Sequence, residues 1–441
     1  MTESRPAWVI MPALGRMTAI PRPCAEADLR STPFFTLRPA TLARLLFFLA
    51  VCVSLFTIRT AQAQTYQILH QFAGPTSDGV TPFGFLVGGN GTIYGTTCYG
   101  GLSYGGTVYS LATSGAETIL YNFNDGYGKC PTSLLSWKGE LYGSAGGGAY
   151  RGGLIFKLDS RGNETILHTF GADTSEGLFP GLYFQNSSGL FYGATGGGTG
   201  GTEGTIFTAT TSGKVIVLYT FVGNKPVGIS GLVPDPSGNL YGSTVYGGSS
   251  NCNLGCGTLF KLDTAGNFTT LYSFTGGSDG SLPYGGIIRD RAGNLYGTTS
   301  EGGVACVPAG CGTVFKFSPS GQLTTLYSFQ GGTDGLFPID NLVRDAAGNL
   351  YGTTTEGGDL ACADFINYGG CGTLFKIDPS GNETIVHTFT GPPGDAGTFG
   401  AGLLMDAAGD IYGASDSGGV ADCNWISDEG IGCGTIFKLT P

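Results

Sequence analysis

Three short motifs recur together along the chain, in the same order in each of seven units of about 50 residues. The first is Tyr-Gly, with its tyrosine at Tyr94, Tyr142, Tyr192, Tyr241, Tyr296, Tyr351 and Tyr412. The second is G-[TL]-[VIL]-[FY], which begins at Gly106, Gly153, Gly204, Gly257, Gly312, Gly372 and Gly434. The third is an apolar residue followed by [HY]-x-F, which ends at Phe72, Phe123, Phe170, Phe221, Phe274, Phe329 and Phe389. Such self-similarity is typical of repeat architectures, in which each unit buries its apolar surface against its neighbours.

One repeat unit, residues 284–329, reads as four β-strands. The strand segments are YGGIIRD, NLYGTTS, GTVFKFS and LTTLYSF, and the turns DRAGN and SPSGQ place Gly where a hairpin needs a positive φ. No segment after residue 64 keeps a 3.6-residue apolar period, so we expect essentially no helix. Each unit is therefore predicted to be a four-stranded antiparallel meander.

Seven such units predict an all-β fold, a seven-bladed β-propeller of four-stranded antiparallel blades. Residues 65–72, TYQILHQF, have the pattern of a fourth strand, and residues 434–440, GTIFKLT, have that of a third strand. We therefore expect the N-terminal strand to pair with the last blade and close the ring. This closure leaves no long unpaired strand edge.

The N-terminal residues are predicted to be a targeting segment. Residues 45–58, LLFFLAVCVSLFTI, follow Arg38 and Arg44 and precede AQA at 61–63. An apolar stretch of this length before small residues is typical of a secretory signal peptide and is short for a membrane span. We expect cleavage after Ala63, with an uncleaved anchor as the alternative. The domains are then an N-terminal extension with signal peptide, 1–63, and a seven-repeat propeller, 64–441, that has no membrane span. The long leader leaves open whether Met11 or Met17 is the true start.

The predicted mature chain is strongly acidic. Residues 1–63 hold seven arginines and three acidic residues, so residues 64–441 keep 14 basic and 29 acidic residues, a formal net charge of −15. This balance argues against nucleic acid and anionic membrane as partners, because both require basic patches. We expect a monomer whose partner is a polysaccharide or another envelope or extracellular protein. The chain shows no C-terminal sorting tail, so surface attachment stays open.

Eight cysteines form local pairs in one type of loop, between the second and third strands of units four to seven. The pairs are Cys252 with Cys256, Cys306 with Cys311, Cys362 with Cys371, and Cys423 with Cys433. The second cysteine always directly precedes the third strand, while the interval within the pair grows. That pattern fits disulfides across the loop bases better than the alternatives, a metal site of fixed geometry or redox chemistry. Cys98 and Cys130 are then expected to link the first two blades.

Acidic and aromatic residues of the same loop face are the candidate ligand-binding residues. They are Asp78, Asp279, Asp334, Glu301, Glu356, Tyr99, Tyr246 and Trp425, with Asp125 and Glu176 at related places. Such oxygens and aromatic faces would suit a carbohydrate or Ca²⁺, although we expect no cofactor and no resident metal. The alternative is that each Asp caps its own turn through a side-chain hydrogen bond, which recurrence in several units favours. A ligand site should break the repeat symmetry, and Trp425 is the clearest break.

The sequence offers no catalytic residues. The three histidines, His70, His168 and His387, occupy one repeat position that the other units fill with Tyr, so we interpret them as packing groups. GLSYG at 101–105 matches a nucleophile elbow and GGGTGG at 196–201 a dinucleotide loop. Both lack the strand-to-helix context that those sites require.

The repeat core NLYGTTxxGG…CGT[LV]FK[LIF]…GNxTx[LV][HY]xF resembles the GloVer repeat of exported bacterial proteins, over residues 66–441. Its period and Gly-Gly pairs are also similar to kelch repeats. The GloVer resemblance implies export and a propeller-like array, with no defined activity. Our leading hypothesis is a secreted or cell-envelope module that binds without catalysis. The competing hypothesis is a carbohydrate-active hydrolase or lyase, which would need two carboxylates roughly 5–10 Å apart over the channel.

Overall fold

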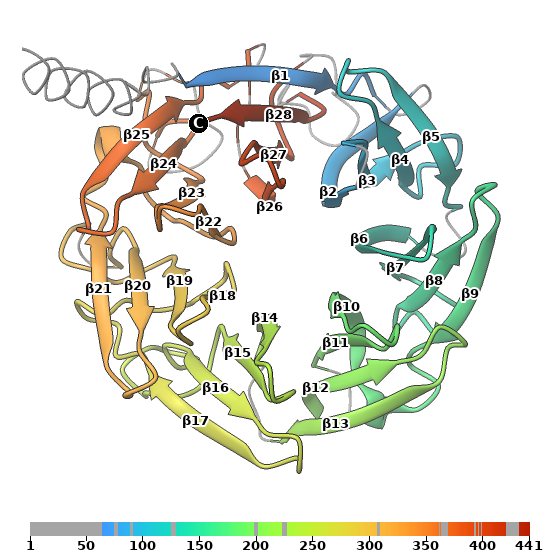
Figure 1. The fold of residues 1–441 in the computed structure, drawn as a ribbon, viewed down its shortest axis with the longest axis horizontal. Coiled ribbons are helices and arrows are strands. Elements are labelled where there is room, and N and C mark those ends of the chain that lie inside the picture. Colours follow the sequence, from blue (N-terminus) through green and yellow to red (C-terminus); the bar gives the residue numbers. More distant parts are fainter. Residues whose placement is uncertain are drawn as a thin grey trace, which may run out of the picture. The chain divides into compact units, whose positions relative to one another are not determined.

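The computed structural model describes most of the chain after the predicted leader, within one compact unit, Gln62–Pro441. The described residues are 64–74, 78–88, 91–124, 129–197, 202–222, 227–306, 309–360, 362, 369–391, 394–395, 397, 399–419 and 432–441. They form seven antiparallel sheets of four strands, arranged as blades around a common axis (Figure 1). The predicted seven-bladed β-propeller is therefore confirmed. The described residues include no α-helix and two short 3₁₀ turns, η1 (Thr174–Glu176) and η2 (Gly332–Asp334).

Six blades are contiguous in sequence. Blade 1 is β2 (Gly79–Val87), β3 (Ile93–Gly100), β4 (Thr107–Leu111) and β5 (Glu117–Asn122). Blade 2 is β6 (Lys129–Trp137), β7 (Glu140–Gly146), β8 (Leu154–Leu158) and β9 (Glu164–Thr169). Blade 3 is β10 (Leu178–Gln185), β11 (Phe191–Gly196), β12 (Thr202–Ala209) and β13 (Val215–Val222). Blade 4 is β14 (Ile229–Pro234), β15 (Leu240–Thr244), β16 (Thr258–Leu262) and β17 (Phe268–Ser273). Blade 5 is β18 (Ile287–Arg289), β19 (Leu295–Thr299), β20 (Thr313–Phe317) and β21 (Leu323–Ser328). Blade 6 is β22 (Val343–Arg344), β23 (Leu350–Thr354), β24 (Thr373–Ile377) and β25 (Glu383–Thr388).

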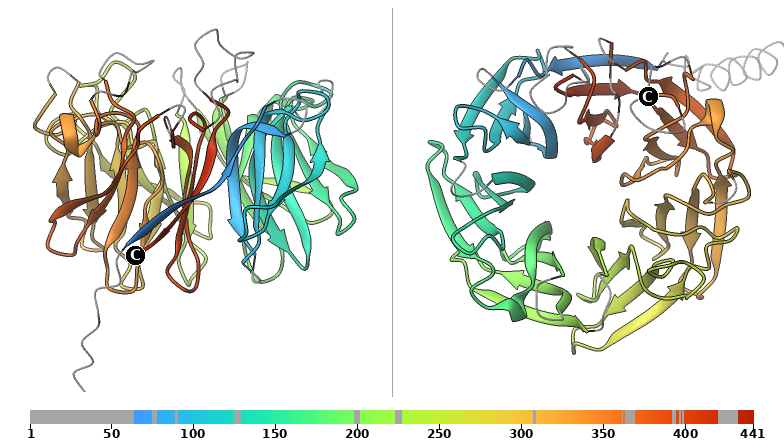
Figure 2. Two further views of the ribbon diagram at one scale, coloured as in Figure 1. Left: turned by 90° about the horizontal axis from the view of Figure 1, so that it is seen from above. Right: turned by 180° about the vertical axis from the view of Figure 1, so that it is seen from behind.

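Blade 7 joins the two ends of the domain. It contains β26 (Phe399–Met405), β27 (Ile411–Ser415) and β28 (Thr435–Thr440), and its fourth strand is β1 (Thr65–Gln71). Strand β1 runs antiparallel to β28, with Thr65 opposite Thr440 and Gln71 opposite Thr435. Figures 1 and 2 show β1 in blue beside β28 in red. The predicted closure of the ring by the N-terminal strand is confirmed. In every blade the first strand, here called the inner strand, lies nearest the axis, and the fourth, the rim strand, lies farthest out.

The first two motifs meet inside each blade. The glycine of Tyr-Gly, on the second strand, lies directly opposite the aromatic residue of the G-[TL]-[VIL]-[FY] motif, on the third, as Gly242 does opposite Phe260. A methyl group on Gly242 would lie 2.4 Å from the Phe260 ring and 2.6 Å from the Gly231 carbonyl oxygen. Only glycine leaves room for the ring, so the two motifs recur together.

The third motif joins neighbouring blades. Its phenylalanine lies at the end of the rim strand or just after it, and it packs against the third-strand aromatic of the next blade, as Phe274 does on Phe315 with ring centroids 5.2 Å apart. The other pairs are Phe72–Tyr109, Phe123–Phe156, Phe170–Phe207, Phe221–Phe260, Phe329–Phe375 and Phe389–Phe437. Each such aromatic pair adds about 0.5–1.5 kcal/mol beyond the apolar area that it buries. All seven blade junctions are thus built around one repeated contact.

Four of the five predicted disulfides are confirmed. Cys98–Cys130 joins β3 of blade 1 to β6 of blade 2, and Cys252–Cys256, Cys306–Cys311 and Cys362–Cys371 close loops in blades 4, 5 and 6. In the fifth predicted pair, Cys433 is disulfide-bonded, while Cys423 lies outside the described residues. Each closed loop loses freedom in the unfolded chain, which stabilises the fold by about 2–3 kcal/mol.

Candidate functional site

The crossover acids Asp279 and Asp334 each bond to the rim strand that precedes them. Asp279 accepts hydrogen bonds from the Tyr272 hydroxyl at 2.9 Å and from the Thr275 N–H at 2.8 Å. Asp334 repeats this arrangement one blade further on, with the Tyr327 hydroxyl at 2.9 Å. These carboxylates close their own turns at the rim-strand ends. A further role in ligand binding stays a prediction.

The histidines use the same arrangement. His168 Nε2 lies 2.9 Å from Glu176 Oε2, and His387 Nε2 bonds to Asp395. Each imidazole also packs edge-on against the phenylalanine two residues later, as His168 does on Phe170 at 4.7 Å between centroids. At this repeat position, all three histidines as well as Tyr272 and Tyr327 bond to a crossover acid, whereas Tyr121 donates to Glu164 of the next rim strand.

The other predicted ligand-binding residues are dispersed. Glu301 and Glu356 form single bridges with Ser281 and Leu336, in the crossovers that lead into their own blades. Burial raises the pKa of Glu301. The Tyr246 hydroxyl lies 2.8 Å from that of Tyr284. Tyr99, on β3, packs against the apolar cluster between blades 7 and 1. Trp425 and Asp125 lie outside the described residues.

A cavity of about 450 Å³ lies among the inner strands. Its walls include Phe83, Tyr183 and Tyr284, together with the polar residues Ser230, Asp340 and Asn341. Glycine and aliphatic residues of the inner strands complete the lining that the structure describes. The size lies within the range of small-molecule sites, which are mostly apolar with a few convergent polar groups.

Asp340 is the buried acid of this cavity, with 6% of its surface exposed. The Thr353 hydroxyl donates a hydrogen bond to its Oδ2 at 2.7 Å. Burial raises the pKa of Asp340 to about 6; the hydrogen bonds from Thr353 and the Gly402 N–H oppose this rise, and the charge of Asp416 adds to it. Among the described residues of the lining, Asp340 carries the only carboxylate.

Asp340 and Asn341 break the repeat symmetry. The residue that precedes the buried apolar position of the inner strand is Asn341 in blade 6, and in the other blades it is Gly84, Ser133, Gly181, Gly231, Gly286 and Gly402. The Asn341 amide donates to the Leu403 carbonyl at 2.9 Å and accepts from the Leu403 N–H at 3.1 Å, which fastens blade 6 to blade 7. One residue earlier, Asp340 stands where no other blade has an acid.

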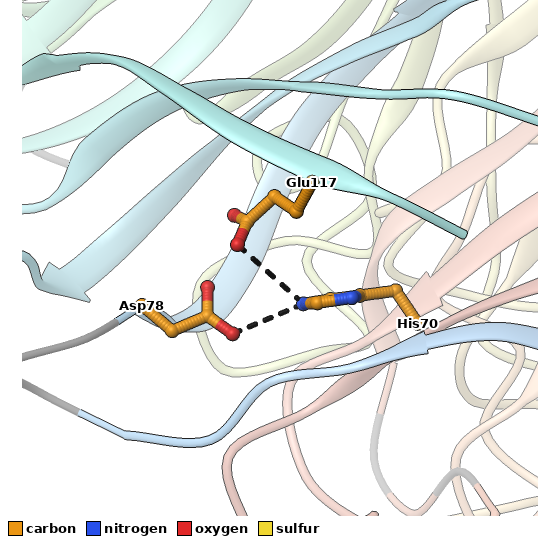
Figure 3. A group of neighbouring side chains, drawn as sticks. All are labelled: His70, Asp78 and Glu117. Carbon is orange, nitrogen blue, oxygen red and sulfur yellow. Dashed lines mark hydrogen bonds and ion pairs between the residues drawn. The ribbon is translucent and has the colours of Figure 1, made fainter. Parts of the chain in front are cut away.

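A second cluster lies where blade 7 meets blade 1. His70 comes from β1, Asp78 from the crossover and Glu117 from the start of β5, and their polar atoms converge (Figure 3). His70 Nε2 lies 3.0 Å from Asp78 Oδ2 and 3.7 Å from Glu117 Oε2. Side-chain exposure is 16% for His70, 8% for Asp78 and 11% for Glu117. The cluster is thus largely buried without being sealed.

The pKa values of the two carboxyl groups in this cluster, Glu117 and Asp78, are shifted in opposite directions. Burial, a hydrogen bond with Asp78 and the charge of Asp78 together raise the pKa of Glu117 to about 9. Burial also acts to raise the pKa of Asp78, but hydrogen bonds from His70, Glu117 and the Gly79 N–H lower it overall.

Sequence patterns do not single out Glu117, which begins β5, or Asp340 and Asn341, which lie just before β22. The available signal is the comparison of the seven repeats position by position. Four residues before the rim-strand His or Tyr, the blades carry Tyr66, Glu117, Glu164, Val215, Phe268, Leu323 and Glu383. Of the three acids at this position, Glu117 is the one that faces a histidine with its own crossover acid, because β5 lies beside β1.

The chain matches one family model twice. The model of the Gloeobacter/Verrucomicrobia repeat covers residues 52–253 and residues 180–427. No curated protein matches the chain in sequence.

Two solved structures share the fold. They are extracellular domains of proposed hybrid two-component systems from B. thetaiotaomicron, with TM-scores of 0.51 and 0.52 at 13% and 12% identity. The alignments cover 86% and 85% of this chain and 41% and 39% of those proteins. The chain therefore spans about two fifths of their length, and the likeness concerns the fold alone.

Proposed function

The chain belongs to the Gloeobacter/Verrucomicrobia repeat family, and we propose that it acts outside the cytoplasm as a module that binds a small sugar, or the end of a glycan, without catalysis. The observation that carries the proposal is the wall of the inner-strand cavity. Asp340 breaks the repeat symmetry there, and Phe83, Tyr183 and Tyr284 share the same wall.

The chemistry of this wall suits a sugar. Aromatic rings pack on the C–H face of a pyranose, and a carboxylate accepts hydrogen bonds from hydroxyl groups at its remaining lone pairs. A ligand hydroxyl that reached Asp340 would meet a buried acceptor, where a hydrogen bond is stronger than in water. The aromatic groups provide contact area and Asp340 provides orientation.

The cavity favours binding over glycoside hydrolysis. Hydrolases of this kind use two carboxyl groups about 5–10 Å apart, one on each side of the bond that breaks. Within the part of the lining that the structure describes, Asp340 stands alone. The hypothesis of a carbohydrate-active enzyme therefore finds less support in this cavity than simple binding does.

An extracellular or periplasmic location is compatible with the four described disulfides, because such bonds persist in oxidising compartments. We propose that residues 1–63 are removed after Ala63, so that the mature chain begins just before β1. Extracellular domains that share the fold support this location. No helix in the described part of the chain is long and apolar enough to cross a membrane.

The test is a thermal-shift and calorimetry screen of the exported protein against monosaccharides and disaccharides, under non-reducing conditions. A sugar at 100 times its Kd should raise the free energy of unfolding by about 2.7 kcal/mol. Asp340→Asn should weaken binding of that sugar at least about tenfold, since it removes a charged acceptor.

The matched control is Asp263→Asn, in the turn between β16 and β17, where Asn makes the same type of turn. This variant should bind like the native protein. The proposal is overturned if no sugar of the panel binds, or if Asp340→Asn binds the sugar as tightly as the native protein does. Either result would favour a protein partner.

A further inference from the structure

The His70 cluster brings three potential metal ligands to one point. His70 offers an imidazole nitrogen, Asp78 and Glu117 offer carboxylate oxygens, and the three ligand atoms lie within 4.8 Å of one another (Figure 3). Within the described ranges this is the only group of three or more such side chains so arranged. The three ligands come from β1, the crossover and β5, so they are held by separate elements.

The spacing of the atoms is close to that of a coordination sphere. Ligands about 2.0–2.2 Å from a tetrahedral or octahedral metal ion lie about 3–3.5 Å from each other. The Nε2 of His70 is 3.0 Å from Asp78 and 3.7 Å from Glu117. Small side-chain movements would therefore bring all three onto one ion.

Glu117 supplies an independent sign that a partner is missing. Its Oε1 is buried and has no hydrogen-bond partner among the described residues, although the other oxygen faces His70. A buried carboxylate oxygen without a partner is costly. A bound cation would satisfy that oxygen and would also separate the negative charges of Glu117 and Asp78.

Two other blade junctions show how the equivalent positions pack when a third metal-ligating side chain is missing. At the junction of blades 2 and 3, His168 bonds to Glu176, and Val215 occupies the place of Glu117. At the junction of blades 6 and 7, Tyr66 fills that place and stacks on His387 at 3.6 Å between centroids. Two of the three groups therefore suffice to build a junction that contains a histidine. Glu383 takes the place of Glu117 at the junction of blades 5 and 6, but it lies beside Tyr327 and not beside a histidine. Among the described residues, the full set of three therefore occurs only where the ring closes.

We propose that His70, Asp78 and Glu117 bind a divalent transition-metal ion, with Zn²⁺ preferred, and that this ion fastens the N-terminal strand to blade 1. One imidazole nitrogen and two carboxylate oxygens match the ligands of Zn²⁺ better than the all-oxygen set of Ca²⁺. Three protein ligands leave at least one coordination position for water.

The first test is titration of Zn²⁺ into the exported protein after treatment with a chelator. One equivalent should bind near pH 7 and raise the melting temperature, while Ca²⁺ and Mg²⁺ at the same concentration should not. Glu117→Gln keeps the shape of the side chain and removes its charge, and it should weaken Zn²⁺ binding at least about tenfold. His168→Gln and Glu164→Gln are matched controls at other junctions and should bind Zn²⁺ like the native protein.

A second measurement needs no variant. The chain has three histidines, so labelling of the imidazole nitrogens gives three signal pairs by NMR. Saturation with Zn²⁺ should move the Nε2 signal of one histidine and leave the other two in place. The proposal is overturned if the native protein binds no stoichiometric Zn²⁺, if Glu117→Gln binds it undiminished, or if the three histidines respond alike.

Discussion

Asp263 and Asp340 carry the same side chain, but folding shifts their pKa values in opposite directions. Asp263 sits in an exposed turn, where hydrogen bonds from the Asn267 amide and the N–H groups of Asn267 and Ala265 lower its pKa. Asp340 is buried among the inner strands, and burial raises its pKa to about 6. Aspartate is thus an exposed turn former at Asp263 and a buried acid at Asp340, as it also is at Asp78 and Asp395 beside their histidines.

This difference predicts a pH dependence. The pKa of Asp340 rises from 3.8 to about 6 on folding, so the proton binds more tightly to the folded chain. That contribution to stability is full below about pH 4 and is lost as the pH rises through 6. Between pH 4 and pH 8, the stability of Asp340→Asn relative to the native protein should therefore increase by about 2–2.5 kcal/mol.

Denaturant unfolding at the two pH values measures this change. Asp263→Asn is again the control, and its relative stability should stay nearly constant between pH 4 and pH 8, because the pKa of Asp263 is lowered on folding and its titration therefore lies below this range. A flat difference between Asp340→Asn and the native protein across this range would show that Asp340 titrates as if exposed.

At the scale of the strand, the glycine of Tyr-Gly and the aromatic residue opposite it form a single unit. Gly242 lies opposite Phe260, and the Phe260 ring fills the space that a side chain at 242 would need. Gly181, on β10, is also a strand glycine, but the nearest atoms to an added methyl group there are 3.9 Å away, in Tyr183. Only the first glycine is required by packing.

We therefore expect Gly242→Ala to lower the free energy of unfolding by about 1–3 kcal/mol, since the added methyl group overpacks the Phe260 site. Gly181→Ala should change it by less than about 0.5 kcal/mol. Thermal or denaturant unfolding of both variants measures the difference. Equal effects would mean that backbone freedom, rather than contact with the ring, explains the recurrence of Gly in the motif.

Structural features that arise from motifs repeated in every blade could be predicted from the sequence. The Gly242–Phe260 unit and the cysteine pairs recur with fixed order, so strands, closure and disulfides follow from the repeats. Glu117 could not be predicted in the same way, because its contact with His70 depends on how two blades stack. Asp340 reads as an ordinary inner-strand residue until the seven repeats are compared position by position.

At the scale of the whole domain, β1 holds the ring closed through three kinds of contact. It pairs along β28, it places Phe72 against Tyr109 of blade 1, and it brings His70 to Asp78 and Glu117. Without β1, strand β28 would present an unpaired edge, and such edges promote association with other chains.

Deletion of residues 64–72 should therefore lower the melting temperature and cause self-association, which light scattering detects. A synthetic peptide of residues 64–73 should restore both properties when it is added to the shortened protein, because it can pair with β28. A shortened protein that stays monomeric with an unchanged melting temperature would contradict this role of β1.

The pairing of Thr65 with Thr440 also determines the order in which the blades can form. Blades 1 to 6 are contiguous, so each can form as soon as its own residues have left the ribosome or crossed a membrane. Blade 7 needs the first strand and the last three, so it forms only when the chain is complete. Closing so long a loop costs only slightly more entropy than closing a shorter one, because that cost grows with the logarithm of length. The first strand to be synthesised is thus among the last to find its partner, and the open ring is the species that chaperones and proteases would meet.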